Sequence, residues 1–306
     1  MKNKKAYLQI SFAWLFAIIV GIFILFLAIY MAIKIIDVGD KTSDLEMGKE
    51  IEILLNPLET SFQSGVKTSF TMPKETRIYN ECNNQGEFGR QLIRISQKSL
   101  NKWTKTEEKV GFSNKYIFSK DYEQGKKFYV FSKPFEFPFK VGDLIYISSA
   151  EEKYCFVNPM ENIKQEIKTL GQENLLIDNC SEKSIKVCFN NEMDCDILVN
   201  YEQGYVEKNT GKIYFEGDAL MYAGIFAEKE LYECQLNRLM KRTSNLALLY
   251  QDKASFISKV GCNSNLKLSE LSSVAEDLTS SANLASINYI VEDIKDKNEN
   301  AECRLW

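Results

Sequence analysis

The longest uncharged segment of the chain is the feature that most limits how it can fold. The 28 residues from Ala6 to Ile33 carry no charge and consist mostly of Ile, Leu, Phe, Ala, Val and Met. A helix needs about 20 apolar residues to cross the hydrocarbon core of a bilayer. A cleaved secretory signal has a shorter apolar region, of about 7–15 residues, and then a site with small residues. No such site follows Ile33. We therefore expect residues 6–33 to form a transmembrane helix that anchors the chain in the lipid bilayer.

The charges beside this segment predict its orientation. Lys2, Lys4 and Lys5 precede it, whereas the lysines just beyond it are matched by aspartates. Because short cytoplasmic segments carry the excess of basic residues, we expect residues 1–5 in the cytoplasm and the C-terminal domain outside it. The chain is then a single-pass protein of the cell membrane. All 42 acidic residues but only 35 of the 38 basic ones follow the helix, so the exported region is mildly acidic. Phosphate binding needs a basic surface, and we expect no nucleic acid partner.

Cysteine usage agrees with an extracytoplasmic domain. An even number of cysteines outside the cytoplasm predicts disulfides, although sequence alone does not choose the pairing. Cys188 and Cys195 flank a polar segment, and a disulfide that staples a hairpin there is the one specific pairing that we expect. The chain has no histidine and no Cys-x-x-Cys, so the usual zinc spacings are absent, and buried reduced thiols remain the alternative. The disulfide candidates all follow the apolar segment: Cys82, Cys155, Cys180, Cys188, Cys195, Cys234, Cys262 and Cys303.

Hydrophobic periodicity divides the rest of the chain into an α+β arrangement. Residues 34–61 predict a juxtamembrane helix that ends or breaks at Asn56–Pro57. Residues 62–216 are β-rich. The clearest alternation of apolar and polar residues occurs at Gln91–Ile95, Lys127–Phe131 and Leu144–Ile147. Residues 217–306 change to the helical period, which predicts a helical C-terminal part packed against the strands.

Several local signals refine this arrangement. Asn158 as a cap and Pro159 as the first helical residue predict a short helix that ends at Leu170. Short strands follow at 175–177, 184–189, 196–200, 204–208 and 212–215, and Asn209–Gly211 predicts a hairpin between the last two. Asp218 is expected to cap a helix. Longer helices are expected from Lys229 to Val260, ended by Gly261, and from Ser269 to Ile294, with apolar stripes that face the core. Whether the β and α parts share one core is left open.

The residue types present limit the chemistry of the chain. Ser-His-Asp catalysis, Cys-His catalysis and histidine metal sites all require the histidine that the chain lacks. We therefore expect no catalytic, cofactor-binding or metal-binding residues and no enzyme activity. Glu192, Asp194 and Asp196 resemble an oxygen-rich cation site without EF-hand spacing, and we interpret them as a solvated turn. Lys241 and Arg242 near Ser244 invite a Ser–Lys pair, but we interpret the two basic residues as a surface basic patch.

Three phenylalanines form the most distinctive local pattern. Phe135, Phe137 and Phe139 alternate with polar residues and prolines in the segment Lys-Pro-Phe-Glu-Phe-Pro-Phe-Lys. Alternate residues of an extended chain share one face. The three rings are a candidate recognition strip, and burial against the domain core is the alternative interpretation.

Two segments carry a likeness to known proteins. Lys4–Lys5, then Gln9–Phe12 and the apolar run, resemble the class III signal of archaeal type IV pilins. In that family a peptidase cuts before the Gln, which makes Gln9 the candidate processing site, and the mature helix packs into a filament core. Leu8 stands where a small residue usually precedes the cut, and Ala13 stands where pilins usually carry Glu.

The second likeness covers most of the chain. Phe131–Ile145, Ala219–Phe226 and Tyr232–Cys234 are similar to segments of uncharacterised, single-pass membrane-anchored envelope proteins encoded by small-genome archaea. This likeness implies an archaeal envelope protein and no particular activity.

These observations leave three functional hypotheses. The first is a non-enzymatic envelope component whose ectodomain acts as a scaffold or binds an envelope protein of unknown identity. The second is a pilin-like filament subunit, which requires a mature chain that begins at Gln9. The third is an ectoenzyme with a carboxylate-based site, which the two carboxylates of glycosidases exemplify.

Overall fold

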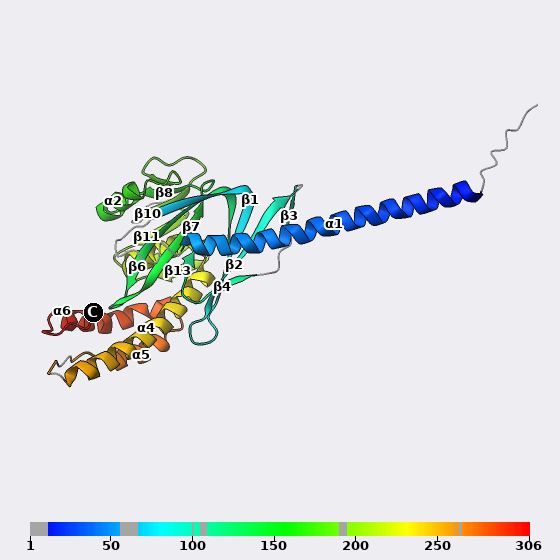
Figure 1. Cartoon of the computed structure of the whole chain (residues 1–306). Helices are drawn as coiled ribbons and strands as arrows, with labels where there is room; N and C mark the ends of the chain where they lie inside the picture. Colours follow the sequence, from blue (N-terminus) through cyan, green and yellow to red (C-terminus); the bar gives the residue numbers. More distant parts are fainter. Residues whose placement is uncertain are drawn as a thin grey trace, which may run out of the picture.

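The apolar segment and the charged segment after it form one continuous helix. The computed structural model describes residues 12–55, 67–99, 101–104, 109–189, 195–259, 261–262 and 265–306. Helix α1 runs from Phe12 to Leu55. Its part from Phe12 to Ala32 is long and apolar enough to cross a membrane, with a mean hydropathy of 3.0 and 0% of it buried. Figure 1 shows this part projecting away from the folded domain, while the C-terminal end of α1 lies beside β2.

The helix expected over residues 34–61 is therefore present over residues 34–55, as a direct continuation of the apolar helix, and it ends just before Asn56–Pro57. Lys34 and Asp37 end the apolar run, but charged residues lower helix stability by only a few tenths of a kcal/mol, roughly, so they do not break a helix. Pro57, the strong breaker, comes only after the end of α1. Residues 56–61 and the N-terminal part of the expected membrane helix, 6–11, lie outside the described residues.

The first sheet contains the long strands of the β-rich region and the short ones between them. Its strand order is β3-β2-β1-β6-β7-β5, with β4 paired to β2. All neighbours are antiparallel except β5 and β7. The strands expected at Gln91–Ile95, Lys127–Phe131 and Leu144–Ile147 all form. The bounds are β1 Lys67–Asn83, β2 Arg90–Ser99, β3 Lys102–Trp103, β4 Val110–Phe112, β5 Tyr116–Phe118, β6 Tyr122–Glu136 and β7 Lys140–Ser149.

This sheet curls until its two ends meet. The side-chain oxygen of Gln91 on β2 accepts a hydrogen bond of 3.1 Å from the backbone N–H of Ile117 on β5. A flat sheet would hold these strands far apart, because neighbouring strands are about 4.8 Å apart. One buried cluster accordingly gathers side chains from β1, β2, β4, β5, β6 and β7, including Ile93, Phe112 and Ile145. The concave side of the first sheet is thus a small core of its own.

The second sheet is built mostly from parallel strands. Its order is β13-β12-β11-β10-β8-β9, in which β9, β8, β10 and β11 run parallel and β12 and β13 form an antiparallel hairpin. The hairpin confirms the signal at Asn209–Gly211, since Lys208 pairs with Gly211. The bounds are β8 Tyr154–Val157, β9 Leu175–Ile177, β10 Ile185–Phe189, β11 Ile197–Asn200, β12 Tyr205–Lys208 and β13 Gly211–Tyr214.

Helix α2, Glu161–Leu170, joins β8 to β9. Met160 is its N-cap residue, so the helix starts two residues after the expected first position, Pro159. Asn158 has a positive φ of 48° and its backbone N–H donates to Asp178 over 2.9 Å. Asn158 therefore belongs to a turn that leaves β8, which a capping pattern read from sequence does not distinguish from a helix start.

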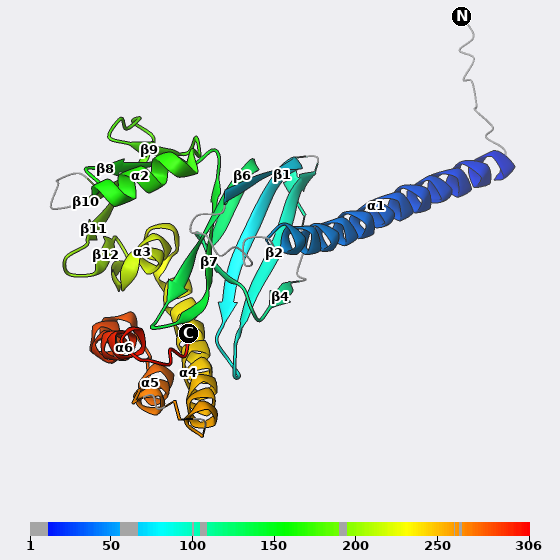
Figure 2. The same cartoon turned by 60° about the vertical axis from the view of Figure 1, so that its left-hand side comes forward.

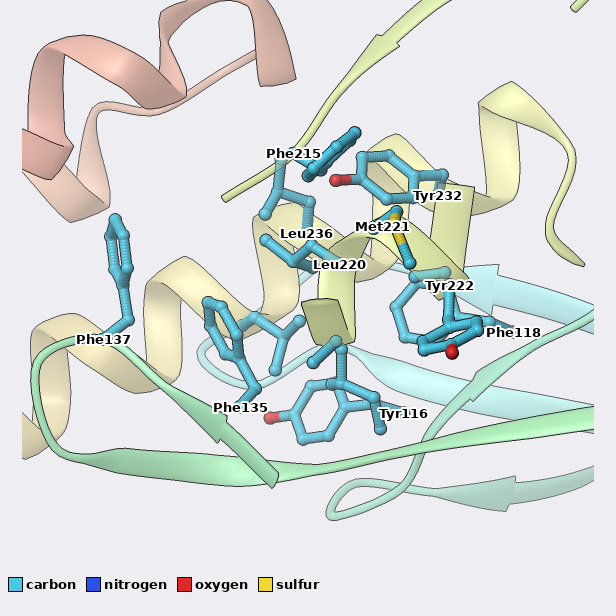
Figure 3. Close-up of a cluster of buried hydrophobic side chains, with 14 of the residues drawn as sticks. Tyr116, Phe118, Phe135, Phe137, Phe215, Leu220, Met221, Tyr222, Tyr232 and Leu236 are labelled. Carbon is cyan, nitrogen blue, oxygen red and sulfur yellow. The ribbon is translucent and has the colours of Figure 1, made fainter. Parts of the chain in front are cut away.

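Helix α3, Gly217–Phe226, lies between the two sheets. Every residue from Ala219 to Phe226 is buried, and the helix contacts β6 and β7 of the first sheet and β12 of the second. A helix that is apolar on all sides is what a central position requires. Figure 3 shows Leu220, Met221 and Tyr222 of α3 among aromatic and aliphatic side chains from the first sheet and α4. Glu216 is the N-cap residue, and Asp218, the expected cap, lies in the first turn.

The C-terminal helices pack against one another and against the first sheet. Helix α4 spans Lys229–Ser258 and contacts β1, β5 and β7, so the expected long helix forms and ends two residues early. Figure 2 shows α5, Leu268–Glu276, and α6, Leu284–Glu299, beside α4 at one end of the molecule. The single helix expected over Ser269–Ile294 is wrong. A 3-10 turn at Ser281–Asn283 separates the two helices, and the backbone N–H and hydroxyl of Ser281 both donate to Glu233.

All eight cysteines are paired. Cys82 on β1 bonds Cys234 on α4, Cys155 bonds Cys180, Cys188 bonds Cys195, and Cys262 bonds Cys303. The expected pairing of Cys188 with Cys195 is therefore present, but the hairpin around it is wrong. Strands β10 and β11 on either side run parallel, so this bond closes the short return between parallel strands.

One main core unites the β-rich and helical parts. It takes in Phe131 and Tyr146 of the first sheet, Val187 of the second, and most of α3 and α4. The α+β class expected from sequence is thus present, with an N-terminal apolar helix, a β-rich region of two sheets and C-terminal helices. Described residues of 67–216 and of 217–306 share this core.

Candidate functional site

The three phenylalanines of the candidate recognition strip are buried. Phe135, Phe137 and Phe139 are 2%, 2% and 1% exposed and belong to the main core. The rings of Phe135 and Phe137 stack with centroids 5.6 Å apart. The ring centroid of Phe139 lies 4.7 Å from that of Tyr250 and 5.3 Å from that of Trp306. The burial interpretation therefore replaces the recognition strip, and Figure 3 shows Phe135 and Phe137 on the side of the strands that faces the later helices.

The remaining sequence candidates do not assemble into a site. Gln9, Glu192 and Asp194 lie outside the described residues, and Asp196 accepts a hydrogen bond from the backbone of Lys186. Lys241 donates to the carbonyls of Asn84 and Gly86, whereas the hydroxyl of Ser244 bonds that of Ser272. The Ser–Lys pair is thus not formed. Lys241 of α4 instead binds the loop between β1 and β2 through hydrogen bonds.

A chain of arginine and aromatic side chains covers the outer face of β1, β2 and β6. Arg94 lies 3.9 Å from the centroid of the Tyr79 ring, which lies 5.5 Å from the ring of Tyr122. Arg77 lies 5.2 Å from the Tyr122 ring and 4.0 Å from that of Trp103. Arg77 and Tyr79 occupy alternate positions of β1 whose intervening residues are buried, as the pleat requires. Arg94, Trp103 and Tyr122 come from β2, β3 and β6. We call Arg77, Tyr79, Arg94, Trp103 and Tyr122 the arginine–aromatic face.

Hydrogen bonds hold this face in place. Arg77 donates to Gln124 over 2.8 Å, and Gln124 donates to Glu75, also over 2.8 Å. Glu75 in turn accepts from Lys98, and this contact lowers the pKa of Glu75 below its usual value. Tyr122 is 46% exposed and the other members are half-buried. The rings are therefore partly exposed and held in place by their neighbours.

A polar cleft begins where this face ends. It is lined by the start of β6, the turn from β7 to β8, the approach to β10 and the residue before α4, and it has a volume of about 550 Å³. A second hollow of about 570 Å³ adjoins it and shares Lys120, Lys183, Ile185 and Glu228 with it. Tyr122 and Gln124 line the cleft and also belong to the network of the arginine–aromatic face. We call the two hollows together the polar cleft.

Glu123 is the most unusual residue of the polar cleft. It is 2% exposed, its Oε2 accepts a hydrogen bond of 2.8 Å from the backbone N–H of Ser149, and its Oε1 has no hydrogen-bond partner. Burial raises the pKa of this carboxyl to about 7, and the nearby charge of Glu152 adds to the shift. Glu152 itself pairs with Lys120 over 2.5 Å.

Lys208 lies in the second hollow, with its ammonium group donating to the carbonyl of Ala227 over 2.6 Å. Burial lowers the pKa of Lys208 to about 8, against the opposing effect of Glu228. Carboxyl and amine groups with shifted pKa values in one cleft are typical of functional sites. A carboxylate-based ectoenzyme would find its proton donor in Glu123.

Neither location was predicted from sequence. The arginine–aromatic face joins β1, β2 and β6, and its register pairs Tyr79 with Arg94 and with Tyr122, which a single strand does not reveal. Glu123 stands in a strand of ordinary alternation, and its burial depends on Ser149 and on the second sheet. The alternation of Arg77, Tyr79 and Glu81 with apolar or amide residues was the signal that would have indicated a polar outer face.

Comparison with known protein families, with curated proteins and with solved structures finds no match to this chain. The likenesses to archaeal pilins and envelope proteins therefore stay predictions from the sequence.

Proposed function

We propose that the protein is a membrane-anchored, extracytoplasmic envelope component that binds another protein and catalyses no reaction. The observation that carries this proposal is the arginine–aromatic face. Tyr, Trp and Arg are the residue types that dominate binding energy in protein interfaces. Here they are concentrated on one sheet face and fixed by mutual contacts, so little conformational freedom is lost on binding.

The membrane and compartment assignments rest on two further features. The apolar part of α1 is long enough to cross a bilayer, and it adjoins a domain whose eight cysteines are all paired. Disulfides persist in oxidising compartments. Together with Lys2, Lys4 and Lys5 before the helix, these features support a cytoplasmic N-terminus and an extracytoplasmic domain.

The chemistry of the face indicates the kind of partner. Arg77, Arg94, Lys98 and Lys109 outnumber Glu75 and Glu81 on this side of the sheet. Guanidinium groups bind carboxylates through paired hydrogen bonds. We therefore propose as partner a folded envelope protein that presents carboxylate side chains around an apolar patch.

Site-specific crosslinking in membranes tests this proposal. A photoreactive phenylalanine analogue in place of Tyr122 lies at the most exposed point of the face, and it is expected to give one dominant crosslinked product. Arg77→Ala in the same chain is expected to reduce that product at least tenfold. Lys212→Ala is the matched control, because Lys212 lies 3.9 Å over the ring of Tyr205 in a cation–π pair on the other sheet. Equal crosslinking in both variants would refute the proposed surface.

Topology is tested separately. Intact mass spectrometry of the chain extracted from membranes without reductant, after thiol alkylation, counts the free thiols. No alkylated thiol is expected for an extracytoplasmic domain. Eight alkylated thiols would show a reduced domain and overturn the compartment assignment.

A pilin-like subunit is the second candidate, and the continuity of α1 favours it. One helix carries both the exposed apolar part and the part beside β2, so the apolar part is a continuous helical extension of the domain. A filament core needs such an extension. The same mass spectrum decides this candidate, because processing before Gln9 removes the first eight residues and a full-length chain excludes it.

A further inference from the structure

The polar cleft is dominated by carboxylates. Its first hollow is lined by Asp121, Glu123, Glu151, Glu152 and Glu228, against Lys120 and Lys183. Lys120 already pairs with Glu152. The negative potential of several acidic groups in one concave wall attracts cations. A solvated acidic surface carries the same charge, so the charge does not by itself identify a ligand.

Glu123 has a buried side-chain oxygen without a hydrogen-bond partner. A carboxylate oxygen that is buried without a hydrogen-bond partner is unfavourable by several kcal/mol, roughly, and is rare in folded proteins. Oε1 of Glu123 is in this condition although the residue belongs to the wall of the cleft. The backbone N–H of Ser149 donates to Oε2, and the backbone of Lys120 also stabilises the carboxylate. The unpaired oxygen is what a site retains for a ligand that brings the missing donor.

The arrangement of the carboxylates limits the type of cation. Within the part of the chain that the structure describes, no group of three or more Cys, Asp or Glu side chains converges as a metal site requires. The acidic groups are instead distributed over a volume of about 550 Å³, within the range of small-molecule sites. Charges spread in this way suit an extended ligand with separated positive groups.

We propose that the polar cleft binds a small linear polyamine, with one ammonium group donating to Oε1 of Glu123 and another pairing with the acidic side chains toward Glu228. The proposed contacts are made by carboxylates and not by Tyr122 or Gln124, the two residues that the cleft shares with the arginine–aromatic network. The bound ammonium group gives Glu123 the partner that the fold does not provide.

Binding then depends on the ionisation of Glu123. The charged and titratable groups around it are Lys120, Asp121, Tyr122, Glu151, Glu152, Tyr154, Lys183 and Glu228. Only the ionised carboxylate pairs with an ammonium group. Since the pKa of Glu123 is about 7, about a tenth of the sites are ready to bind at pH 6 and most are ready at pH 8.

Calorimetric titration of the full-length protein in detergent tests the proposal, with spermidine and 1,4-diaminobutane as probes and methylammonium as the single-charge comparison. Both polyamines are expected to bind at pH 8 with one site per chain, and about tenfold more weakly at pH 6. Glu123→Gln keeps the acceptor for the Ser149 N–H, and it is expected to lower the affinity at least tenfold and to remove the pH dependence.

The matched control is Glu173→Gln, which removes the same charge at an 83% exposed side chain outside the cleft. This variant is expected to bind like the natural chain. Failure of both polyamines to bind at pH 8, equal binding of methylammonium, or equal weakening by the two substitutions would overturn the proposal. Thermal unfolding of each variant distinguishes loss of the site from loss of the fold.

Discussion

Cys82 and Cys234 are joined by a disulfide that ties β1 of the first sheet to α4 across a sequence separation of 152 residues. The two Cα atoms are 6.1 Å apart, within the ordinary range for a disulfide. This bond links the β-rich region to the helical region beside the buried contact between Gln235 of α4 and Gln91 of β2. It therefore closes by far the largest loop among the four disulfides.

Removing this disulfide is expected to destabilise the protein more than removing the smallest one. For loops of 152 and 7 residues, the loss of loop entropy in the unfolded chain corresponds to about 5 and about 2 kcal/mol. The double variants Cys82→Ser/Cys234→Ser and Cys188→Ser/Cys195→Ser are compared by urea unfolding of the full chain in detergent. Equal midpoints for the two variants would contradict the pairing scheme.

Arg238 is the second determinant of the attachment of α4. Its side chain is 0% exposed and lies 4.8 Å from the ring of Tyr116, and its guanidinium group donates only to uncharged oxygens. Hydrogen bonds from a charged group are each worth about 1.5–3 kcal/mol. Arg238→Ala is expected to lower the free energy of unfolding by at least about 3 kcal/mol. The acceptors are the carbonyls of Phe88, Phe112, Ser113 and Lys115 and the side chain of Gln235.

Arg90→Ala is the control for this prediction, because Arg90 is an exposed arginine at the start of β2. Surface substitutions of this kind usually change stability by no more than about 0.5 kcal/mol. Denaturant midpoints of the two variants in the same detergent give the comparison. Similar midpoints would show that Arg238 does not hold the loops of the first sheet on α4.

The parts of the fold that sequence predicted are those with a local cause. The strand at Leu144–Ile147 and the hairpin at Asn209–Gly211 depend on neighbouring residues alone, and both are present. The break between α5 and α6 was not predicted, because it depends on Ser281 bonding Glu233, 48 residues away. Glu123 escaped prediction for the same reason, since nothing beside it in sequence reveals that Ser149 and the second sheet enclose it.

The burial of the phenylalanine segment makes a direct prediction about Phe139. This ring is 1% exposed and packs against Tyr250 and Trp306. Phe139→Ala is expected to cost about 3–5 kcal/mol through lost burial and a residual cavity. Phe256→Ala on the outer side of α4 removes the same side chain at 71% exposure, and a change below about 0.5 kcal/mol is expected. A large effect of Phe256→Ala alone would instead indicate a covered surface there.

Glu123 predicts a dependence of stability on pH. Its pKa is about 7 in the folded protein and 4.5 is the ordinary value, so the folded state holds a proton between these values that the unfolded state has lost. The stabilising contribution is therefore complete below about pH 4.5 and is lost as the pH rises through about 7. A difference of this size corresponds to about 3 kcal/mol.

Glu123→Gln removes this titration, so its stability relative to the natural chain is expected to rise by that amount between pH 4.5 and pH 8. Urea unfolding of both chains without added amines measures the difference, with Glu173→Gln as the control for a lost surface charge. A constant difference across this range would mean that the carboxyl of Glu123 ionises with an ordinary pKa, and the buried, unpaired oxygen would then require solvent that reaches it.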